Sequence, residues 1–481
     1  MDNIESLFSR LIAYSENEWL EFKHNNYEPF MIGRDISALA NGATFTNRKY
    51  AYMIWGVEDS TKEIVGTSFN FGSAKKGNED LECWLRSMLS DNADFEWHNF
   101  LYNGKNICIL IINKAINQPV MFQKTEYIRE GSHTKLLNDV PTMKTVLWNK
   151  LRNDIYEDLT AKSNLSLVSA LQLLDYSAYF DARKVSIPTN AEQIEHYLLE
   201  EGFLEKQEDG FYSITNLGAI LYAKQIHDFP KLERKALRIV QYKGNNRLEM
   251  LKEESFEKGY AIVFDNAIKY IEALIPAEEV IDGGLRKTNS SYPILAIREA
   301  VANALIHQDF CITGSSPTVE IFDKRIEITN PGTPLVDIKR IVDNPPKSRN
   351  EKLAAIMRRL GICEEMGSGW DKMVISCEIH QQPAPQIMLY EDSTRVILYS
   401  EKAFNSLTLE EKIWACYMHA CIKQIQGEQI TNSSLRLRFG VPESSAGSIS
   451  RLIKECVEKG IIKPLDPTTA PKHMKYTPYW A

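Results

Sequence analysis

The spacing of apolar residues changes along the chain and predicts different elements in different regions. Residues 1–20 and 31–41 carry apolar side chains at helical spacing. Residues 50–57 (YAYMIWGV) and 107–112 (ICILII) are continuous apolar runs of strand length. Such runs are typical of strands that are covered on both faces. Roughly the first 150 residues therefore predict an α/β domain.

The pattern becomes mostly helical between residues 160 and 235. Residues 189–223 (TNAEQIEHYLLEEGFLEKQEDGFYSITNLGAILYA) have the order helix, β-turn-β, helix of a small winged-helix or connecting module. Glutamates crowd its helix and would repel a phosphate backbone, so we interpret this region as a structural connection. Residues 236–244 (ALRIVQYKG) then predict a strand, and residues 264–274 predict a long amphipathic helix.

A further helix is predicted at residues 292–310 (YPILAIREAVANALIHQDF), with one apolar face. On this helix Glu299, Asn303 and His307 recur every fourth residue, which aligns three polar side chains in one column. Such a column is either the ordinary polar side of an amphipathic helix or a functional site.

The residues that follow this helix favour a functional site. Residues 318–322 (TVEIF) and 325–329 (RIEIT) predict a β-hairpin that ends at Asn330-Pro331-Gly332. A helix is expected at residues 350–360, and Gly367-Ser368-Gly369 opens another. Backbone N–H groups in a glycine turn at a helix N-terminus form an anion site. A carboxylate, an amide able to hold a metal and a phosphate-binding turn are therefore predicted in one unit.

The C-terminal region predicts a closing hairpin at residues 383–400, followed by three helices and a terminal strand. This order fits a winged helix-turn-helix, in which the third helix enters the major groove of DNA. The residues expected to contact nucleic acid are Ser444, Ser445, Ser448 and Arg451 on that helix, with Arg436, Arg438, Lys472 and Lys475 at phosphates. Winged helices also serve in dimerisation or protein docking, so both uses remain open.

Composition limits the class of protein. The 481 residues, 44% hydrophobic and 25% charged, are ordinary for a globular protein and predict three domains or more. The net charge of −8 means that nucleic-acid contacts must rely on local patches. Residues 401–481 are the basic segment, with 11 Lys and Arg against 8 Asp and Glu.

The cysteines and the hydropathy of the sequence indicate the cellular compartment in which the protein is expected. Eight scattered cysteines without C-x-x-C pairs predict reduced thiols in a cytoplasmic protein. No stretch approaches roughly 18 apolar residues, and the start is acidic where a signal peptide is basic. We therefore expect no membrane contact and no secretion.

The region that contains the Glu299-x-x-x-Asn303 helix and the Gly367 and Gly369 turn resembles the gyrase/Hsp90/histidine-kinase/MutL (GHKL) ATPases, most closely the divergent branch found in Schlafen AlbA-type bacterial proteins. The resemblance implies that ATP is the cofactor, that Glu299 polarises the attacking water and that Asn303 holds Mg²⁺. Asn330 replaces the adenine-binding aspartate of the family, which removes the charge from that contact. The candidate nucleotide-binding residues are Asn303, His307, Asn330, Gly332, Arg349, Asn350, Gly367, Ser368 and Gly369.

Residues 15–135 resemble the Schlafen AlbA-2 domain. The matching residues are Glu16, Glu21-Phe22-Lys23, Ala40-Asn41, Gly56-Val57-Glu58-Asp59, Ile64-Val65-Gly66 and residues 127–132. The resemblance departs after Asn41, where many members have a glycine-rich turn.

Schlafen proteins that cut tRNA and rRNA use three carboxylates to bind a metal. By resemblance these are Glu16, Glu21 and Asp59, which would bind Mg²⁺ or Mn²⁺, and Lys23 would neutralise the phosphate. Arg129 and His133 are candidate phosphate contacts. The alternative is that these acids are solvated ends of strands.

We therefore expect an α/β and α+β multidomain protein. Its domains are a Schlafen AlbA-2-like nucleic-acid domain (1–158), a helical or winged-helix linker (159–235), a GHKL-type α/β sandwich (236–402) and a winged helix-turn-helix (403–481). One interpretation is an ATP-binding regulator whose contacts with DNA or structured RNA are switched by nucleotide. A second is a metal-dependent nuclease gated by ATP, acting in anti-phage defence, and a third is a scaffold with two degenerate sites. The resemblance also implies a homodimer or higher oligomer.

Overall fold

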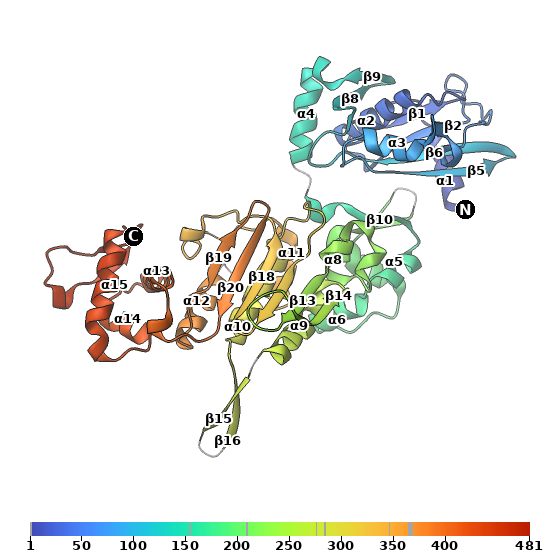
Figure 1. Cartoon of the computed structure of the whole chain (residues 1–481). Helices are drawn as coiled ribbons and strands as arrows, with labels where there is room; N and C mark the ends of the chain where they lie inside the picture. The colour runs from blue at the N-terminus through green and yellow to red at the C-terminus, as the bar shows by residue number, and fades with distance from the viewer. Residues whose placement is uncertain are drawn as a thin grey trace. The chain divides into compact units, whose positions relative to one another are not determined.

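The computed structural model describes residues 2–152, 155–207, 210–275, 277–282, 285–345, 347–363 and 369–481 (Figure 1). It forms two units, the N-terminal unit Met1–Ile155 and the C-terminal unit Tyr156–Ala481. Helices and sheets mix in both units, which confirms the expected α/β and α+β class. Among the described residues, no helix is both long and apolar enough to cross a membrane.

The N-terminal unit is built on a four-stranded sheet of order β1-β2-β6-β5. β1 and β2 are parallel, and the other neighbours are antiparallel. The two apolar runs of the sequence form its central strands, β2 and β6, as predicted. The strands of this sheet are β1 (Leu20–Lys23), β2 (Tyr50–Trp55), β5 (Phe95–Tyr102) and β6 (Lys105–Asn113). The other elements are α1 (Asp2–Leu11), α2 (Pro29–Phe45), α3 (Leu81–Met88), α4 (Pro141–Arg152), and the short strands β3 (Lys75–Lys76), β4 (Glu79–Asp80), β7 (Met121–Phe122), β8 (Thr125–Glu130) and β9 (His133–Leu136).

Helix α2 positions two segments that carry candidate site residues. The buried amide of Asn41 donates hydrogen bonds to the carbonyl oxygens of Val120 (2.9 Å), just before β7, and Tyr127 (2.7 Å), within β8, which fixes both segments against the helix. Gly42 faces the segment before β1 so closely that a Cβ atom there would stand 1.9 Å from the Glu18 carbonyl oxygen. The backbone near Glu18 and the strand β8 are therefore both held by one turn of α2.

The C-terminal unit begins with a small module that has its own sheet, of order β10-β12-β11. The predicted order helix, β-turn-β, helix is present as α7, β11, β12 and α8. The elements of this module are β10 (Thr160–Leu165), α5 (Leu167–Leu173), α6 (Tyr176–Arg183), α7 (Ala191–Glu200), β11 (Leu204–Lys206), β12 (Tyr212–Thr215) and α8 (Asn216–Tyr222).

The centre of the C-terminal unit is a six-stranded sheet of order β14-β13-β17-β18-β20-β19 (Figure 1). Its strands are β13 (Leu237–Tyr242), β14 (Met250–Phe256), β17 (Thr318–Phe322), β18 (Arg325–Pro331), β19 (Gln386–Leu389) and β20 (Ser393–Tyr399). The helices of this region are α9 (Tyr260–Leu274), α10 (Ile294–Ile306), α11 (Glu351–Arg359) and α12 (Gly369–Ile379), and a separate hairpin consists of β15 (Ala277–Asp282) and β16 (Leu285–Ser290). Helix α10 packs on β18 and contacts both α9 and α12.

The two faces of this sheet differ in chemistry. On β17, the buried apolar Val319 and Ile321 alternate with Glu320, because successive side chains of a strand point to opposite faces. Glu320 lies directly opposite Glu327 of β18. Arg247 stands between these like charges, with Nη2 2.7 Å from Glu320 Oε2 and 3.0 Å from Glu327 Oε2. One face therefore packs into the apolar core, and the other carries a neutralised charge network.

The chain ends in three helices and a two-stranded hairpin. These elements are α13 (Leu409–Ile425), α14 (Asn432–Arg438), α15 (Ala446–Glu458), β21 (Ile462–Pro464) and β22 (Tyr476–Pro478). Thr408 and Glu411 form a capping box at the start of α13. The element order agrees with the predicted one, while the assignment as a winged helix and the expected domain boundaries stay predictions.

Candidate functional site

Helix α10 carries the polar column predicted from the sequence. Its apolar side is buried, and the carboxylate of Glu299 is buried with it, with 3% of the residue exposed. Asn303, one turn later, is half-buried. His307 is the C-cap, and its N–H donates a hydrogen bond to the Asn303 carbonyl oxygen (2.9 Å). Burial lowers the pKa of His307, and nearby Arg349 lowers it further, so the imidazole is neutral at pH 7.

The start of α12 faces Glu299 and Asn303. Helix α12 begins at Gly369, where a Cβ atom would stand 2.5 Å from Glu299 Oε2 and 3.7 Å from Asn303 Nδ2. Only glycine fits this approach without displacing the carboxylate. The other two residues of the predicted turn, Gly367 and Ser368, lie outside the described residues. The glycine that the sequence singled out therefore meets the predicted catalytic and metal-binding side chains.

The turn after β18 lies against the end of α10. Gly332 has a φ of +96°, and a Cβ atom there would stand 2.8 Å from the Asp309 Cβ. The Asp309 N–H donates to the Pro331 carbonyl oxygen (2.9 Å). Asn330 is buried, and its amide donates to the same carbonyl oxygen (3.0 Å). Asn330 and Gly332 are thus placed beside the helix as expected, and the role of Asn330 toward adenine stays a prediction.

Arg349 and Asn350 also reach the end of α10. Arg349 pairs with Asp309, with Nη1 3.1 Å from Oδ2. The buried Asn350 amide donates to the carbonyl oxygens of Ile306 (2.7 Å) and Gln308 (2.9 Å). Both Nδ2 hydrogens of Asn350 are thereby used within the protein, so this amide fastens α10 instead of offering a donor to a ligand.

Two acidic residues of this region were missed by the sequence reasoning. Asp309 follows the column by two residues and joins the Gly332 turn to Arg349. Asp371 lies in the first turn of α12, and burial raises its pKa to about 6. Their only sequence signal is their position just after the His307 column and just after the glycine turn.

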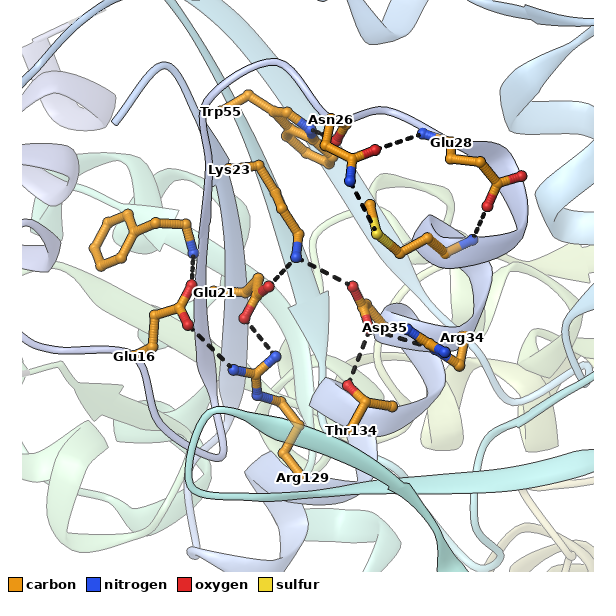
Figure 2. A network of polar contacts seen from close by, with 12 residues as sticks. Glu16, Glu21, Lys23, Asn26, Glu28, Arg34, Asp35, Trp55, Arg129 and Thr134 are labelled. Carbon is orange, nitrogen blue, oxygen red and sulfur yellow. Dashed lines mark hydrogen bonds and ion pairs between the residues drawn. The ribbon is translucent and has the colours of Figure 1, made fainter. Parts of the chain in front are cut away.

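The N-terminal unit contains a buried cluster of opposite charges (Figure 2). Arg129, from β8, is fully buried with 0% exposure, and its Nη1 lies 2.5 Å from Glu21 Oε2. Its Nε donates to the Asn17 carbonyl oxygen (2.8 Å), and Nη2 lies 3.9 Å from Glu16 Oε2. Lys23 contacts Glu21 from the other side. The guanidinium and ammonium groups therefore face two of the three carboxylates that were predicted to hold a metal, Glu16 and Glu21.

The same cluster extends to Asp35, which the sequence reasoning missed. Lys23 Nζ lies 3.6 Å from Asp35 Oδ2, and Thr134 donates to Asp35 Oδ1 (3.0 Å) (Figure 2). Burial raises the pKa of Asp35 and raises that of Glu16 to about 7, in the latter case with the like charges of Glu21 and Asp59 adding to it. The raised pKa values mean that ionising Asp35 or Glu16 costs more free energy in this cluster than in water.

One prediction for the N-terminal unit needs correction, and the others stay predictions. Arg129 is not a surface phosphate contact, because it is buried among acids. Asp59 has a half-exposed side chain that pairs with Lys62 (2.8 Å). Within the described part of the chain, no group of three or more His, Cys, Asp or Glu has the arrangement of a metal site. The binding of Mg²⁺ or Mn²⁺ by Glu16, Glu21 and Asp59 stays a prediction. His133 is exposed, as a phosphate contact requires.

The basic residues predicted at the C-terminus fall into two groups. Arg451, Lys472 and Lys475 are exposed and remain candidates for phosphate contacts, and Ser445, Ser448 and Arg436 are partly exposed. Arg438 is buried instead, with Nε 3.2 Å from Glu378 Oε1 and Nη2 donating to the Gln382 carbonyl oxygen (2.7 Å). The prediction for Arg438 is therefore wrong, because this side chain joins α14 to the end of α12.

The α/β sheet, the polar column on α10 and the glycine start of α12 define a candidate nucleotide-binding domain. Two family models match parts of the chain. Residues 16–138 match the model described as Schlafen, AlbA_2, and residues 314–398 match the model described as putative ATP-dependent DNA helicase recG C-terminal. The second match spans β17 to β20 and does not include α10. The candidate roles of Glu299 and Asn303 are therefore supported by the geometry of the site and not by this match. The resemblances to the Schlafen AlbA-2 domain and to a divergent ATPase domain are confirmed.

The chain was also compared with solved structures and with curated proteins. A solved structure of the DIP2311 protein from Corynebacterium diphtheriae aligns over 93% of this chain and 92% of that one, with 18% identity and a TM-score of 0.42. No curated protein matches the chain. The two family matches together indicate a nucleic-acid-associated protein with an ATP-binding domain.

Proposed function

We propose that the chain binds ATP with Mg²⁺ between α10 and the start of α12, hydrolyses it, and changes its affinity for nucleic acid with the nucleotide state. The observation that carries this proposal is the approach of Gly369 to Glu299 and Asn303, which brings the start of α12 beside both side chains. A glycine start of a helix presents backbone N–H groups to an anion. A carboxylate and a carboxamide on the facing helix complete the chemistry that hydrolysis of a phosphoanhydride needs.

Each residue has a distinct role in this proposal. Glu299 orients and deprotonates the attacking water as a general base. The Asn303 side-chain oxygen is a ligand of the kind that Mg²⁺ prefers, and the bound ion would neutralise charge on the phosphates. Asp309 and Arg349 hold the Gly332 turn against α10. The neutral His307 adds no positive charge beside Asn303.

Nucleic acid is the proposed second ligand. The match of residues 16–138 to an AlbA-type domain supports this, and the exposed Arg451, Lys472 and Lys475 supply positive charge on the basic C-terminal segment. Contacts of this kind position a protein on a phosphate backbone, so they do not select DNA over RNA. A change in affinity with nucleotide requires that the two nucleotide states bind nucleic acid differently.

Calorimetry with a non-hydrolysable ATP analogue and Mg²⁺ tests binding, and phosphate release from ATP tests hydrolysis. Glu299→Ala is expected to retain binding and to lose about 10²-fold or more in turnover. Asn303→Ala is expected to lose the Mg²⁺ dependence of binding. Glu272→Ala, an exposed acid on the neighbouring α9, is the matched control and keeps wild-type values.

The nucleotide dependence is measured by anisotropy of labelled tRNA and duplex DNA, with and without the analogue. A thermal shift at analogue concentrations about 100 times Kd corresponds to a stabilisation of roughly 2.7 kcal/mol. If the analogue neither shifts the melting transition nor changes nucleic-acid affinity, the chain is a scaffold and the proposal is wrong.

A further inference from the structure

The first three residues of the C-terminal unit make specific contacts with the candidate nucleotide-binding domain. The Tyr156 ring stacks on Phe310, with centroids 5.3 Å apart and planes 9° apart. Lys352 Nζ lies 2.6 Å from both carboxylate oxygens of Asp158. Glu157, between them, is almost fully buried, with 1% exposure. This coupling segment, Tyr156–Asp158, is therefore seated on the protein and is not a free linker.

Glu157 closes the N-terminus of α11. Its two carboxylate oxygens accept hydrogen bonds from the backbone N–H groups of Leu353 (2.5 Å) and Lys352 (3.4 Å). The first N–H groups of a helix lack partners within the helix, and a negative charge is favourable there. Burial raises the pKa of Glu157 in spite of these two hydrogen bonds, which shows how far the carboxylate has been taken from water.

The helix needs this cap because its own N-cap residue is engaged elsewhere. Asn350 occupies the N-cap position of α11 but makes no side-chain capping bond. Its amide donates instead to the Ile306 and Gln308 carbonyl oxygens at the end of α10. Glu157 thus caps α11 from about 195 residues away in the sequence, and Asn350 is released to hold the helix that carries Glu299.

The C-terminal end of α11 contacts the small module that contains the sheet β10-β12-β11. Arg359, in its last turn, pairs with Glu201, and the distance from Nη1 to Oε1 is 3.2 Å. Arg183 holds the same carboxylate at 2.9 Å. The Asn216 amide donates to the Tyr156 carbonyl oxygen (3.0 Å), which anchors the coupling segment to α8. Helix α11 is therefore fastened at both ends by residues that precede the six-stranded sheet.

We infer that Glu157 is a positioning residue for the nucleotide site, through which the seating of Tyr156–Asp158 and the binding of nucleotide are coupled. The inference rests on the proposed function. The path is short: Glu157 holds α11, Asn350 joins α11 to the end of α10, and α10 carries Glu299 and Asn303. Tyr156 is the first residue of the C-terminal unit, so the seated segment lies where that unit begins. By linkage, nucleotide that favours the seated segment must be bound more tightly when the segment is seated.

The test is hydrogen exchange and calorimetry on the full chain, with a non-hydrolysable ATP analogue and Mg²⁺ as the probe. In the wild type, the analogue is expected to slow amide exchange at Lys352 and Leu353 and in peptides that contain Tyr156–Asp158. Glu157→Ala is expected to weaken analogue binding at least fivefold, the lower end of typical coupling between sites, and to abolish the slowing of exchange at residues 352–353. Glu157→Gln, which keeps one acceptor, recovers part of both effects.

Glu272→Ala, the exposed acid on α9, is the matched control. It removes a carboxylate that belongs neither to Tyr156–Asp158 nor to α10 or α11. Its analogue affinity is expected to stay within twofold of the wild type. If Glu157→Ala does not fold, the exchange measurement on the wild type and the Glu157→Gln variant decide the question.

The outcomes separate the inference from the proposed function. Analogue binding by the wild type, with exchange at Lys352 and Leu353 unchanged and with Glu157→Gln affinity equal to wild type, overturns the inference and leaves the proposed function standing. Absence of analogue binding by the wild type overturns both.

Discussion

Gly369 stands so close to Glu299 that a methyl group in its place would lie 2.5 Å from the Glu299 carboxylate. Gly369→Ala is therefore expected to push this carboxylate out of position. Because a misplacement of about 1 Å can cost roughly 10²-fold in rate, turnover of ATP should fall by about that factor while the fold is retained. Phosphate release and a thermal melt, measured on the same preparation, check both parts.

Gly447→Ala is the matched control for this glycine substitution. Gly447 lies within α15, and an added Cβ atom there would meet nothing within 4 Å. Alanine in a helix is favoured over glycine, so this variant should melt at or above the wild-type temperature with unchanged turnover. Equal turnover in Gly369→Ala and Gly447→Ala would contradict the placement of the site.

Arg129→Ala is expected to lower the free energy of unfolding of the N-terminal unit. The substitution leaves Glu21 buried beside Glu16 without the guanidinium, and breaking a buried pair costs about 3–5 kcal/mol. Urea unfolding should show this loss, and Lys135→Ala, at an exposed pair with Glu130, should not. A variant that unfolds like the wild type but binds tRNA less well would restore Arg129 as a phosphate contact.

The buried Arg438 and the exposed Arg451 should respond differently to substitution by alanine. Arg438→Ala removes one of the two partners of Glu378, the other being His419, and is expected to lower the free energy of unfolding by about 3 kcal/mol. Arg451→Ala, at an exposed position, should leave stability unchanged and reduce the slope of log affinity against log salt by about 1. Salt titrations of DNA binding test this, and an unchanged slope for Arg451→Ala would count against the predicted groove-facing helix.

Lys235 predicts a pH dependence of stability. Its side chain is buried, with Nζ donating to the Ile312 carbonyl oxygen (2.5 Å), and burial lowers its pKa below 10.5 although Asp309 and Cys311 oppose this. Between the folded and unfolded pKa values the unfolded chain binds more protons, so Lys235 contributes stability that grows as pH rises toward 10.5 and is lost as pH falls. Relative to Lys235→Met, the wild type should gain in urea midpoint between pH 7 and about pH 10. A constant difference between the two proteins would mean that Lys235 titrates normally.

The elements with one buried face were predictable from the sequence. Helix α10, the β17–β18 hairpin and α13 each have a regular apolar period, and this local signal agrees with the final structure. Strand β14 was missed because its sequence, MLKEESF, lies at the edge of the sheet, and six of its seven residues are exposed. Without a buried face, a strand has no alternating pattern to read.

The partners of charged residues were not predictable, because they come from distant parts of the chain. Arg129 was expected to contact phosphate, but it is buried against Glu21 and Asn17. Asn350 was correctly placed at a helix start, but its amide faces α10 because Glu157 supplies the cap. Local spacing identifies which groups can do chemistry, whereas the tertiary fold decides which of them are already occupied.

The buried cluster around Arg129 also sets an order of events during synthesis. Asn17 and Arg129 are 112 residues apart in the sequence, yet their contact closes the cluster. At typical elongation rates, the carboxylates of Glu16 and Glu21 emerge on the order of ten seconds before the guanidinium that neutralises them. Until then, these two acids lack the guanidinium that pairs with them in the folded unit. The contacts of Arg129 with Glu16 and Glu21 can therefore form only after β8 has been synthesised.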